Sequence, residues 1–197
     1  MSKDLMLDVG QANELKLAFR RADFSNDDIK RLCEGDVLTD VRSVLRGYAC
    51  ITAVTHVIDC DADPFVPDGF TLEAHKKDGQ FSFGPAQVVF HQVDGQRDNR
   101  SIKGTRLRTM LEDLPVLNVN VLDFLLTNPH LIPEEWKSKV STRYIYFWGT
   151  IYRDSRTNLY VRCLCWSEMR WRSHTSNLND YWKYYDTAAV RKTNLEP

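Results

Sequence analysis

The sequence predicts an α+β fold, in which a helical N-terminal region and a mixed middle region precede a C-terminal antiparallel β-meander. Apolar residues recur at helical spacing over residues 11–46. From Tyr144 onward the apolar period changes to two, as in a β-strand whose faces differ. The chain has 197 residues, 43% hydrophobic and 27% charged. This composition is ordinary for a globular protein, and such a length can bury a sizeable core without disulfides or metals.

Residues 1–47 form the predicted helical region, with about three short helices. The first begins near residue 11, where leucines and alanines alternate with lysines and arginines at roughly helical spacing. The second begins at Ser25, which makes an approximate capping box with Asp28, three residues later. A third apolar stripe ends before Gly47, and its members are Val37, Leu38, Val41, Val44 and Leu45.

Residues 48–137 are predicted to form a mixed α/β region. The stretch YACITAVTHVIDC is rich in β-branched residues and predicts a strand, and the loop DADPFVPDGF follows it. A second strand is predicted in AQVVFHQV. A helix in TRLRTMLEDLP ends before Pro115, and another helix, capped by Asn118 or Asn120, comes after it.

Residues 138–197 are predicted to form the antiparallel meander, with about three strands separated by short polar turns. In the first strand one face carries Tyr144, Tyr146, Trp148 and Tyr152, and the other carries Ile145, Phe147 and Ile151. The aromatic tail NDYWKYYDTAAV is expected to cover one edge of the sheet. The three regions are also compatible with one compact domain.

The bulk properties predict a cytoplasmic protein with no membrane partner. No apolar run approaches the roughly 20 residues needed to cross a bilayer. The start, MSKDLMLDVG, has no apolar core of signal-peptide length. The five cysteines are odd in number and irregular in spacing, which does not fit a disulfide framework and suits a reducing compartment.

Four sequence blocks resemble, in the same order, those of a family of small bacterial proteins without an established activity. The blocks are FSNDDIKRLCEGD, HVIDCDADPFVPDGF, PVLNVNVLDFLLTNPHLIPEEWK and YFWGTIYRDSRTNLYVRCLCW. The resemblance covers most of the chain. It implies a bacterial cytoplasmic protein and assigns no catalytic or binding residue.

The first candidate site is the acidic loop that follows the strand predicted at 48–60. Its potential ligands or proton carriers are His56, Asp59, Cys60, Asp61, Asp63 and Asp68. Clustered carboxylates suit Mg²⁺ or Ca²⁺, and a His/Cys pair suits Zn²⁺. The spacing matches neither an EF-hand nor a zinc motif. The alternative is a turn in which aspartates bond to their own backbone, so a divalent metal is the weaker expectation and no other cofactor is predicted.

The second candidate site is the aromatic and arginine-rich face of the meander. Residues 138–197 carry ten Lys and Arg against five Asp and Glu, and residues 1–137 carry 16 against 22. Arginines beside aromatic rings suit single-stranded nucleic acid, because rings stack on bases and guanidinium groups hold phosphates. The candidate binding residues are Tyr146, Trp148, Arg153, Arg162, Trp166, Arg170, Trp171 and Arg172. The alternatives are that the chain itself or a protein partner covers this face.

Together these patterns predict a non-enzymatic interaction module that binds a macromolecular partner through the aromatic and arginine-rich sheet face. A protein partner or a homo-oligomer is the leading expectation. Single-stranded RNA or DNA on the same face is one alternative. A metal-dependent enzyme using His56, Asp59, Asp61 and Asp63 is the other, and no catalytic residue is otherwise predicted.

Overall fold

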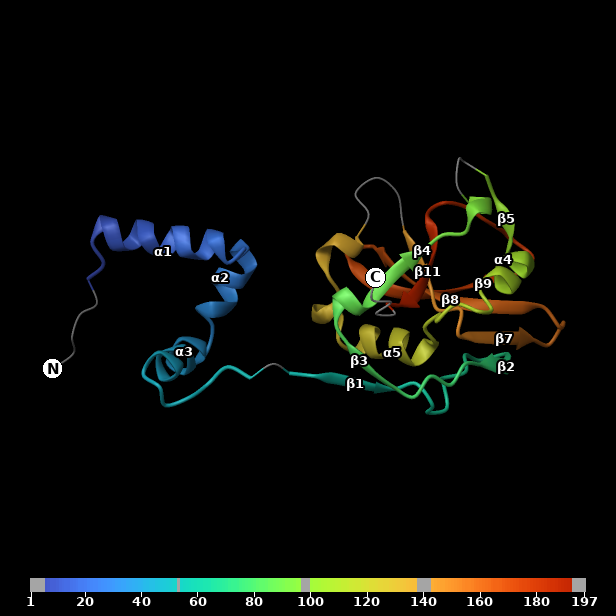
Figure 1. Ribbon diagram of the computed structural model, residues 1–197, viewed down its shortest axis with the longest axis horizontal. Helices are drawn as coiled ribbons and strands as arrows, with labels where there is room; N and C mark the ends of the chain where they lie inside the picture. The colour runs from blue at the N-terminus through green and yellow to red at the C-terminus, as the bar shows by residue number, and fades with distance from the viewer. Residues whose placement is uncertain (1–5, 53, 97–99, 138–142, 193–197) are drawn as a thin grey trace. The chain divides into compact units, whose positions relative to one another are not determined.

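The computed structural model describes residues 6–52, 54–96, 100–137 and 143–192 (Figure 1). The chain divides into two compact units, Met1–Val54 and Thr55–Pro197. The first unit is helical and the second is rich in strands, so the predicted α+β class is confirmed. The expectation about a leader peptide falls partly on residues 1–5, which lie outside the described residues. No helix in the described ranges is long and apolar enough to cross a membrane.

Three helices form the first unit, as the sequence predicts: α1 (Val9–Arg21), α2 (Asn26–Leu32) and α3 (Val37–Leu45). Asp8 caps α1 by accepting a hydrogen bond from the backbone N–H of Gln11, whose side chain bonds back to the Asp8 N–H. Ser25 and Asp28 form the predicted capping box at α2. These caps satisfy helix N–H groups that have no partner inside the helix.

The second unit centres on a seven-stranded sheet with the order β2-β7-β8-β6-β11-β4, in which β9 also pairs with β8. Its strands are β2 (Phe70–His75), β4 (Val88–His91), β6 (Tyr144–Tyr146), β7 (Thr150–Asp154), β8 (Leu159–Ser167), β9 (Arg170–Asn177) and β11 (Asp186–Arg191). Because β8 is antiparallel to β6, β7 and β9, the predicted meander is present. Strands β2 and β4 join this sheet, so the middle and C-terminal regions share one unit.

Smaller elements cover the sheet. Two short antiparallel ribbons pair β1 (His56–Asp59) with β3 (Gln80–Phe83), and β5 (Ile102–Lys103) with β10 (Tyr181–Trp182). The helices are α4 (Gly104–Met110) and α5 (Val119–Thr127), the latter capped by Asn118. Single 3-10 turns are η1 (Pro85–Gln87), η2 (Asp94–Gln96), η3 (Pro129–Leu131) and η4 (Glu134–Trp136).

Two sequence-based expectations about strands are wrong. The strand predicted over residues 48–60 is limited to β1, because residues 48–52 and 54–55 are exposed and unpaired. The tail does not cover an edge of the sheet, because β11 lies between a parallel β6 and an antiparallel β4. Small buried side chains at Ala188 and Ala189 let β11 fit inside the sheet, between two covering layers.

The long strand that begins at Tyr144 breaks between β6 and β7. Trp148 and Gly149 form a turn there, so the alternation of faces restarts at Thr150. Ile145 and Phe147 pack on one side of the sheet with Tyr152, whereas Ile151 packs on the other side. The prediction that Ile151 shares a face with Ile145 is therefore wrong.

The sheet forks at this break. On the same side of the broken strand, β11 pairs with β6 and β2 pairs with β7. The segment that leads into α5 enters the fork: the Leu117 N–H donates to Ala189 O at 2.9 Å, and the Gly149 N–H donates to Leu117 O at 3.0 Å. Thr150 Oγ1 then accepts the Val119 N–H at 3.2 Å. The segment leading into α5 thus supplies hydrogen-bond partners to backbone groups of β11 and Gly149 that lie on either side of the fork.

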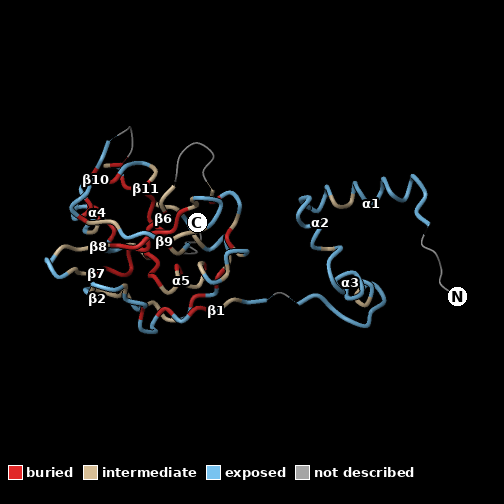
Figure 2. The backbone as a smooth tube through the Cα atoms, turned by 180° about the vertical axis from the view of Figure 1, so that it is seen from behind, coloured by how far each residue is buried: buried red, intermediate tan, exposed pale blue. Residues whose placement is uncertain are grey.

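The central strands of the sheet carry buried side chains on both faces. Figure 2 shows buried stretches of chain, in red, in this unit. On one face α5 and the β1–β3 ribbon cover Ile145, Phe147 and Leu164. On the other face α4 and the β5–β10 ribbon cover Tyr146, Val161 and Cys163. The unit is therefore three layers thick, and no face of its central strands is left for solvent.

Gly149→Ala tests the fork. An added Cβ at Gly149 would lie 2.9 Å from Asn118 N, Cα and Cβ, and that backbone is fixed between strands. We expect the free energy of unfolding in urea to fall by about 1–3 kcal/mol, the usual cost of overpacking. Gly84→Ala is the matched control, because its nearest atom is a flexible Gln87 side chain at 3.8 Å. Equal destabilisation by both substitutions would contradict a tight fork.

Candidate functional site

The aromatic residues at the start of the meander lie inside the protein. Tyr146 and Trp148 are only 4% and 5% exposed. Their rings pack on Trp182 of β10, with centroid distances of 4.0 Å and 4.9 Å, and the Tyr146 hydroxyl contacts Ser176 Oγ at 3.0 Å. β10 thus covers these two predicted binding residues, as in the alternative in which the chain itself covers this face.

Three of the candidate arginines are paired with carboxylates of the same chain. Arg162 is buried and forms a two-pronged ion pair with Asp123 of α5, at 2.6 and 3.0 Å. Arg153 pairs with Glu73 at 2.7 Å. Arg172 pairs with Glu168 across the β8–β9 turn. Each carboxylate reduces the positive charge that the guanidinium group offers to an external anion.

The remaining candidates lie on β8 and β9. Trp166 and Trp171 are half-buried and contact each other edge-on, with ring centroids 5.4 Å apart. The ammonium of Lys137 lies 3.7 Å from the centre of the Trp166 ring. Arg170 is exposed. The eight predicted residues are thus divided between the interior and the surface and do not form one exposed face.

The aspartates of the acidic loop shape a turn. Asp59 Oδ1 accepts the Asp61 N–H, and Asp61 Oδ1 accepts the Gly79 N–H, both at 2.9 Å. Cys60 is buried, and the ring of His56 packs against Phe124. Asp63 is exposed. Within the described part of the chain, no three His, Cys, Asp or Glu side chains are placed to hold one metal ion.

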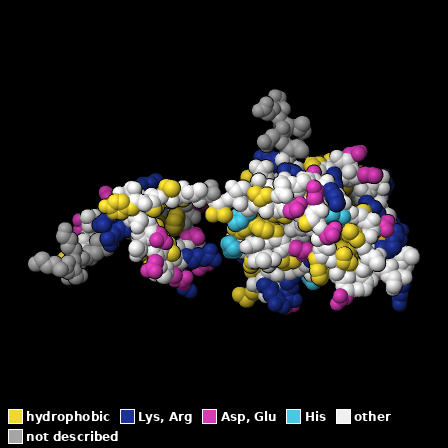
Figure 3. Space-filling view, turned by 90° about the horizontal axis from the view of Figure 1, so that it is seen from below, with side chains coloured by type: hydrophobic (Ala, Val, Ile, Leu, Met, Phe, Trp, Pro, Cys, Tyr) yellow, Lys and Arg dark blue, Asp and Glu magenta, His cyan; other side chains and the backbone are white. Residues whose placement is uncertain are grey.

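Among the described residues, most of the large apolar side chains that are exposed lie on the helical unit. The sequence patterns predicted no binding site there. None of the described residues of this unit is buried (Figure 2). Figure 3 shows hydrophobic side chains on this unit among charged ones. The large exposed apolar residues are Met6, Leu7, Val9, Leu15, Leu17, Phe24, Val37, Leu38, Val41, Leu45, Tyr48, Ile51 and Val54. The signal was available: three short amphipathic helices have too little chain to make a core alone.

A groove runs between α1 and α2 in this unit. Its volume is about 440 Å³, and its apolar lining includes Leu7, Leu15, Phe19, Phe24 and Ile29. The rings of Phe19 and Phe24 contact each other at 5.1 Å. A second hollow on the same helix shares Leu15. Leu15 is therefore the central apolar residue of the exposed surface of α1.

A separate cleft of about 530 Å³ opens in the second unit, beside α4. Trp148, Ile151 and Leu178 belong to its apolar floor, and Lys76 and Arg108 belong to its rim. His75 also lines it, but both ring nitrogens are engaged, by Thr150 Oγ1 at 2.9 Å and by Cys60 O at 3.2 Å. The cleft thus offers an apolar base and cationic edges.

No protein-family model, no curated protein and no solved structure matches the chain. The resemblance to a bacterial family therefore stays a prediction.

Asp123→Ala tests the ion pair that joins α5 to β8. The Arg162 side chain is 7% exposed, so it would become a buried charge without its partner. We expect the free energy of unfolding to fall by about 3 kcal/mol or more. Glu134→Ala removes the exposed pair with Lys137 and should cost less than about 1 kcal/mol. A smaller loss for Asp123→Ala than for Glu134→Ala would contradict this assignment.

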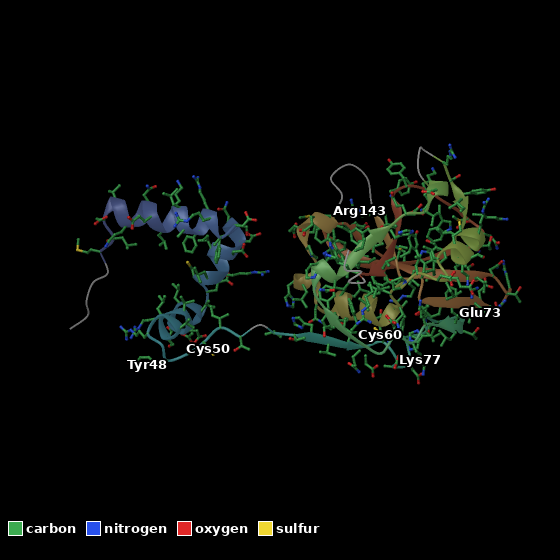
Figure 4. All side chains as sticks on the ribbon, viewed as in Figure 1. Tyr48, Cys50, Cys60, Glu73, Lys77 and Arg143 are labelled. Carbon is green, nitrogen blue, oxygen red and sulfur yellow. The ribbon has the colours of Figure 1, made fainter. Side chains whose placement is uncertain are left out.

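Thiol titration tests the placement of the five cysteines, of which two are exposed and three are buried. Cys33 and Cys50 are exposed (Cys50 is labelled in Figure 4), so both should react quickly with Ellman's reagent. Burial raises the pKa of Cys60 to about 11 and that of Cys163 to about 12, and it also raises the pKa of Cys165. These three thiols stay protonated at neutral pH and should react only after unfolding in urea. A third fast thiol in the folded protein would contradict the buried placement.

Proposed function

We propose that the chain is a non-enzymatic interaction module that binds a protein partner through the apolar helices of its N-terminal unit. One observation carries the proposal: no described residue of that unit is buried, although many of its apolar side chains are large. Contiguous exposed apolar surface of this kind marks interaction sites in other proteins. The proposal keeps the predicted class of function and moves it from the sheet face to the helices.

The free energy that burial of the exposed apolar side chains would contribute supports a partner. A leucine or phenylalanine side chain contributes about 1.5–3 kcal/mol when it is transferred from water to a packed interior. Leu15 and Phe24 are still 47% and 42% exposed, so much of that contribution is unused within the unit. Isolated helices shorter than about 12–15 residues are marginal in water. Since α2 has 7 residues and α3 has 9, a partner surface would stabilise them considerably.

The partner that α1 fits best is a second copy of the chain. Acidic groups, Asp8 and Glu14, lie in the first half of the helix, whereas Lys16, Arg20 and Arg21 lie in the second half. In an antiparallel pair with a two-fold axis near Leu15, the acidic half of each copy faces the basic half of the other. The opposed helix dipoles also favour this arrangement.

Side-chain sizes agree with the same arrangement. With Leu15 near the two-fold axis, the small Ala12 of one copy faces the large Phe19 of the other. Ala12 and Phe19 both line the groove between α1 and α2, so the interface would fill a hollow that already exists. Large-to-small pairing is the usual way in which facing helices interdigitate. An interface of this kind is self-complementary, as two-fold symmetry requires.

The two alternatives have less support. Nucleic acid would have to compete with Glu73, Asp123 and Glu168 for three of the arginines. A metal-dependent reaction would have to use Asp59 and Asp61, whose oxygens accept backbone N–H groups. We also place the protein in the cytoplasm, where five unpaired thiols stay reduced.

A charge-exchange experiment tests self-association. The basic variant is Glu14→Lys, and the acidic variant carries Arg20→Glu together with Arg21→Glu. Each variant places like charges opposite each other in its own antiparallel pair, so each should be monomeric by light scattering at concentrations where the wild type is dimeric. An equimolar mixture should restore the dimer, because opposite charges then face each other at both ends.

Leu15→Glu should also give a monomer, because it places two carboxylates at the two-fold axis. Leu72→Glu is the matched control, since Leu72 is 42% exposed in the second unit and should leave the dimer unchanged. A wild-type monomer at all concentrations would contradict the second copy as partner. A heavier particle with a raised 260/280 nm absorbance ratio would indicate nucleic acid instead.

A further inference from the structure

The cleft beside α4 has the properties of a small-molecule site. Its volume of about 530 Å³ is within the range of about 300–1,000 Å³ that ligand pockets usually have. It lies between α4 on one side and the β2 and β7 strands on the other. All of these elements belong to the second unit, so the cleft does not depend on the position of the helical unit.

The apolar part of the cleft lining combines accessible and buried side chains. Ala74 and Leu159 are half-buried and pack against the core cluster on this face of the sheet. Trp148, Ile151 and Leu178 belong to that cluster and are at most 5% exposed. The Trp148 ring packs on Trp182 at 4.9 Å, which holds it in place. A rigid apolar floor can bind a flat or flexible apolar group at little conformational cost to the protein.

Two cationic side chains line the rim of the cleft, and both are half-buried. They are Lys76, directly after β2, and Arg108 of α4. No ion pair joins either one to a carboxylate within the described ranges, unlike Arg153 and Arg162. Lys76 Nζ donates to Leu114 O at 2.8 Å, which fixes one of its three N–H bonds and leaves two available. The one carboxylate of the lining, Glu112, is exposed.

We propose that this cleft binds a small amphipathic carboxylate, whose apolar part lies on Ala74 and Leu159 beside the core residue Trp148 and whose carboxylate bonds to Lys76 and Arg108. An arginine can bond to both oxygens of a carboxylate, and the lysine adds a second charge. Two hydroxyl groups of the lining, on Thr105 and Thr109, are exposed beside Arg108. This site is independent of the proposed self-association of α1.

The experiment is isothermal titration of the full chain with octanoate, 1-octanol and octyltrimethylammonium, each below its micelle-forming concentration. Octanoate should bind at one site per chain, with an affinity at least about tenfold above that of the neutral alcohol. The cation should not bind measurably, because it would meet two positive groups at the rim. Removal of one charge-assisted hydrogen bond corresponds to about tenfold or more in affinity.

Substitutions in the cleft, with matched controls beside it, test whether octanoate binds in the α4 cleft. Arg108→Gln and Lys76→Gln should each weaken octanoate binding about tenfold or more. Arg106→Gln and Lys77→Gln are the controls: both residues are exposed neighbours outside the cleft lining, and Lys77 is labelled in Figure 4. Each control should bind octanoate as the wild type does. Thermal melts by circular dichroism check that all four variants are folded.

Several results would overturn the proposal. These are equal binding of octanoate and octanol, equal weakening by control and cleft variants, or no binding of octanoate at all. Leu15→Glu separates this site from the helical unit, since it should leave octanoate binding unchanged. Loss of binding in that variant would place the octanoate on α1 and would contradict the cleft, whatever the oligomeric state.

Discussion

The close approach of Asn118 to Gly149 is the constraint on which the second unit depends. Asn118 Nδ2 donates to Cys60 O at 2.8 Å and to Lys76 O at 2.9 Å, and its Oδ1 accepts the Asn120 N–H. One buried side chain thus joins the loop after β1, the end of β2 and the start of α5 (Cys60 is labelled in Figure 4). Only glycine at 149 leaves room for that backbone. The fork of the sheet, both covering layers and the α4 cleft all meet at this point.

The fork also explains why the aromatic strand is an interior element. Because the β6–β7 strand breaks at Trp148 and Gly149, its two halves pair with different neighbours and each half is covered on both faces. Tyr146 and Trp148 are both buried, and Trp148 also lines the α4 cleft. Aromatic content in this strand therefore reflects core packing.

Local sequence patterns predicted the helices and strands. They could not predict which distant segments of the chain pair with each other. The Ser25 capping box and the period of two after Tyr144 depend on neighbours in the chain, and both were correctly read from the sequence. The parallel pairing of β11 with β6 and the Arg162–Asp123 ion pair join segments about 40 residues apart, and no local rule selects such partners. The exposed helices differ from both cases: their apolar stripes are local and were predicted, whereas their exposure depends on how small a core three short helices can make.

The small size of the core that α1–α3 can make determines the stability of the helical unit. A unit whose described residues are all exposed or half-buried gains little stability from its own contacts, so its folding free energy is small and its helices are easily lost. In the proposed dimer, binding to a second copy would add a stabilising term that grows with concentration, since only the folded helices offer the apolar surface. Folding of α1–α3 and the proposed association would then be one linked equilibrium. The second unit, which has its own core on both sides of a sheet, would remain folded at concentrations where the helices melt.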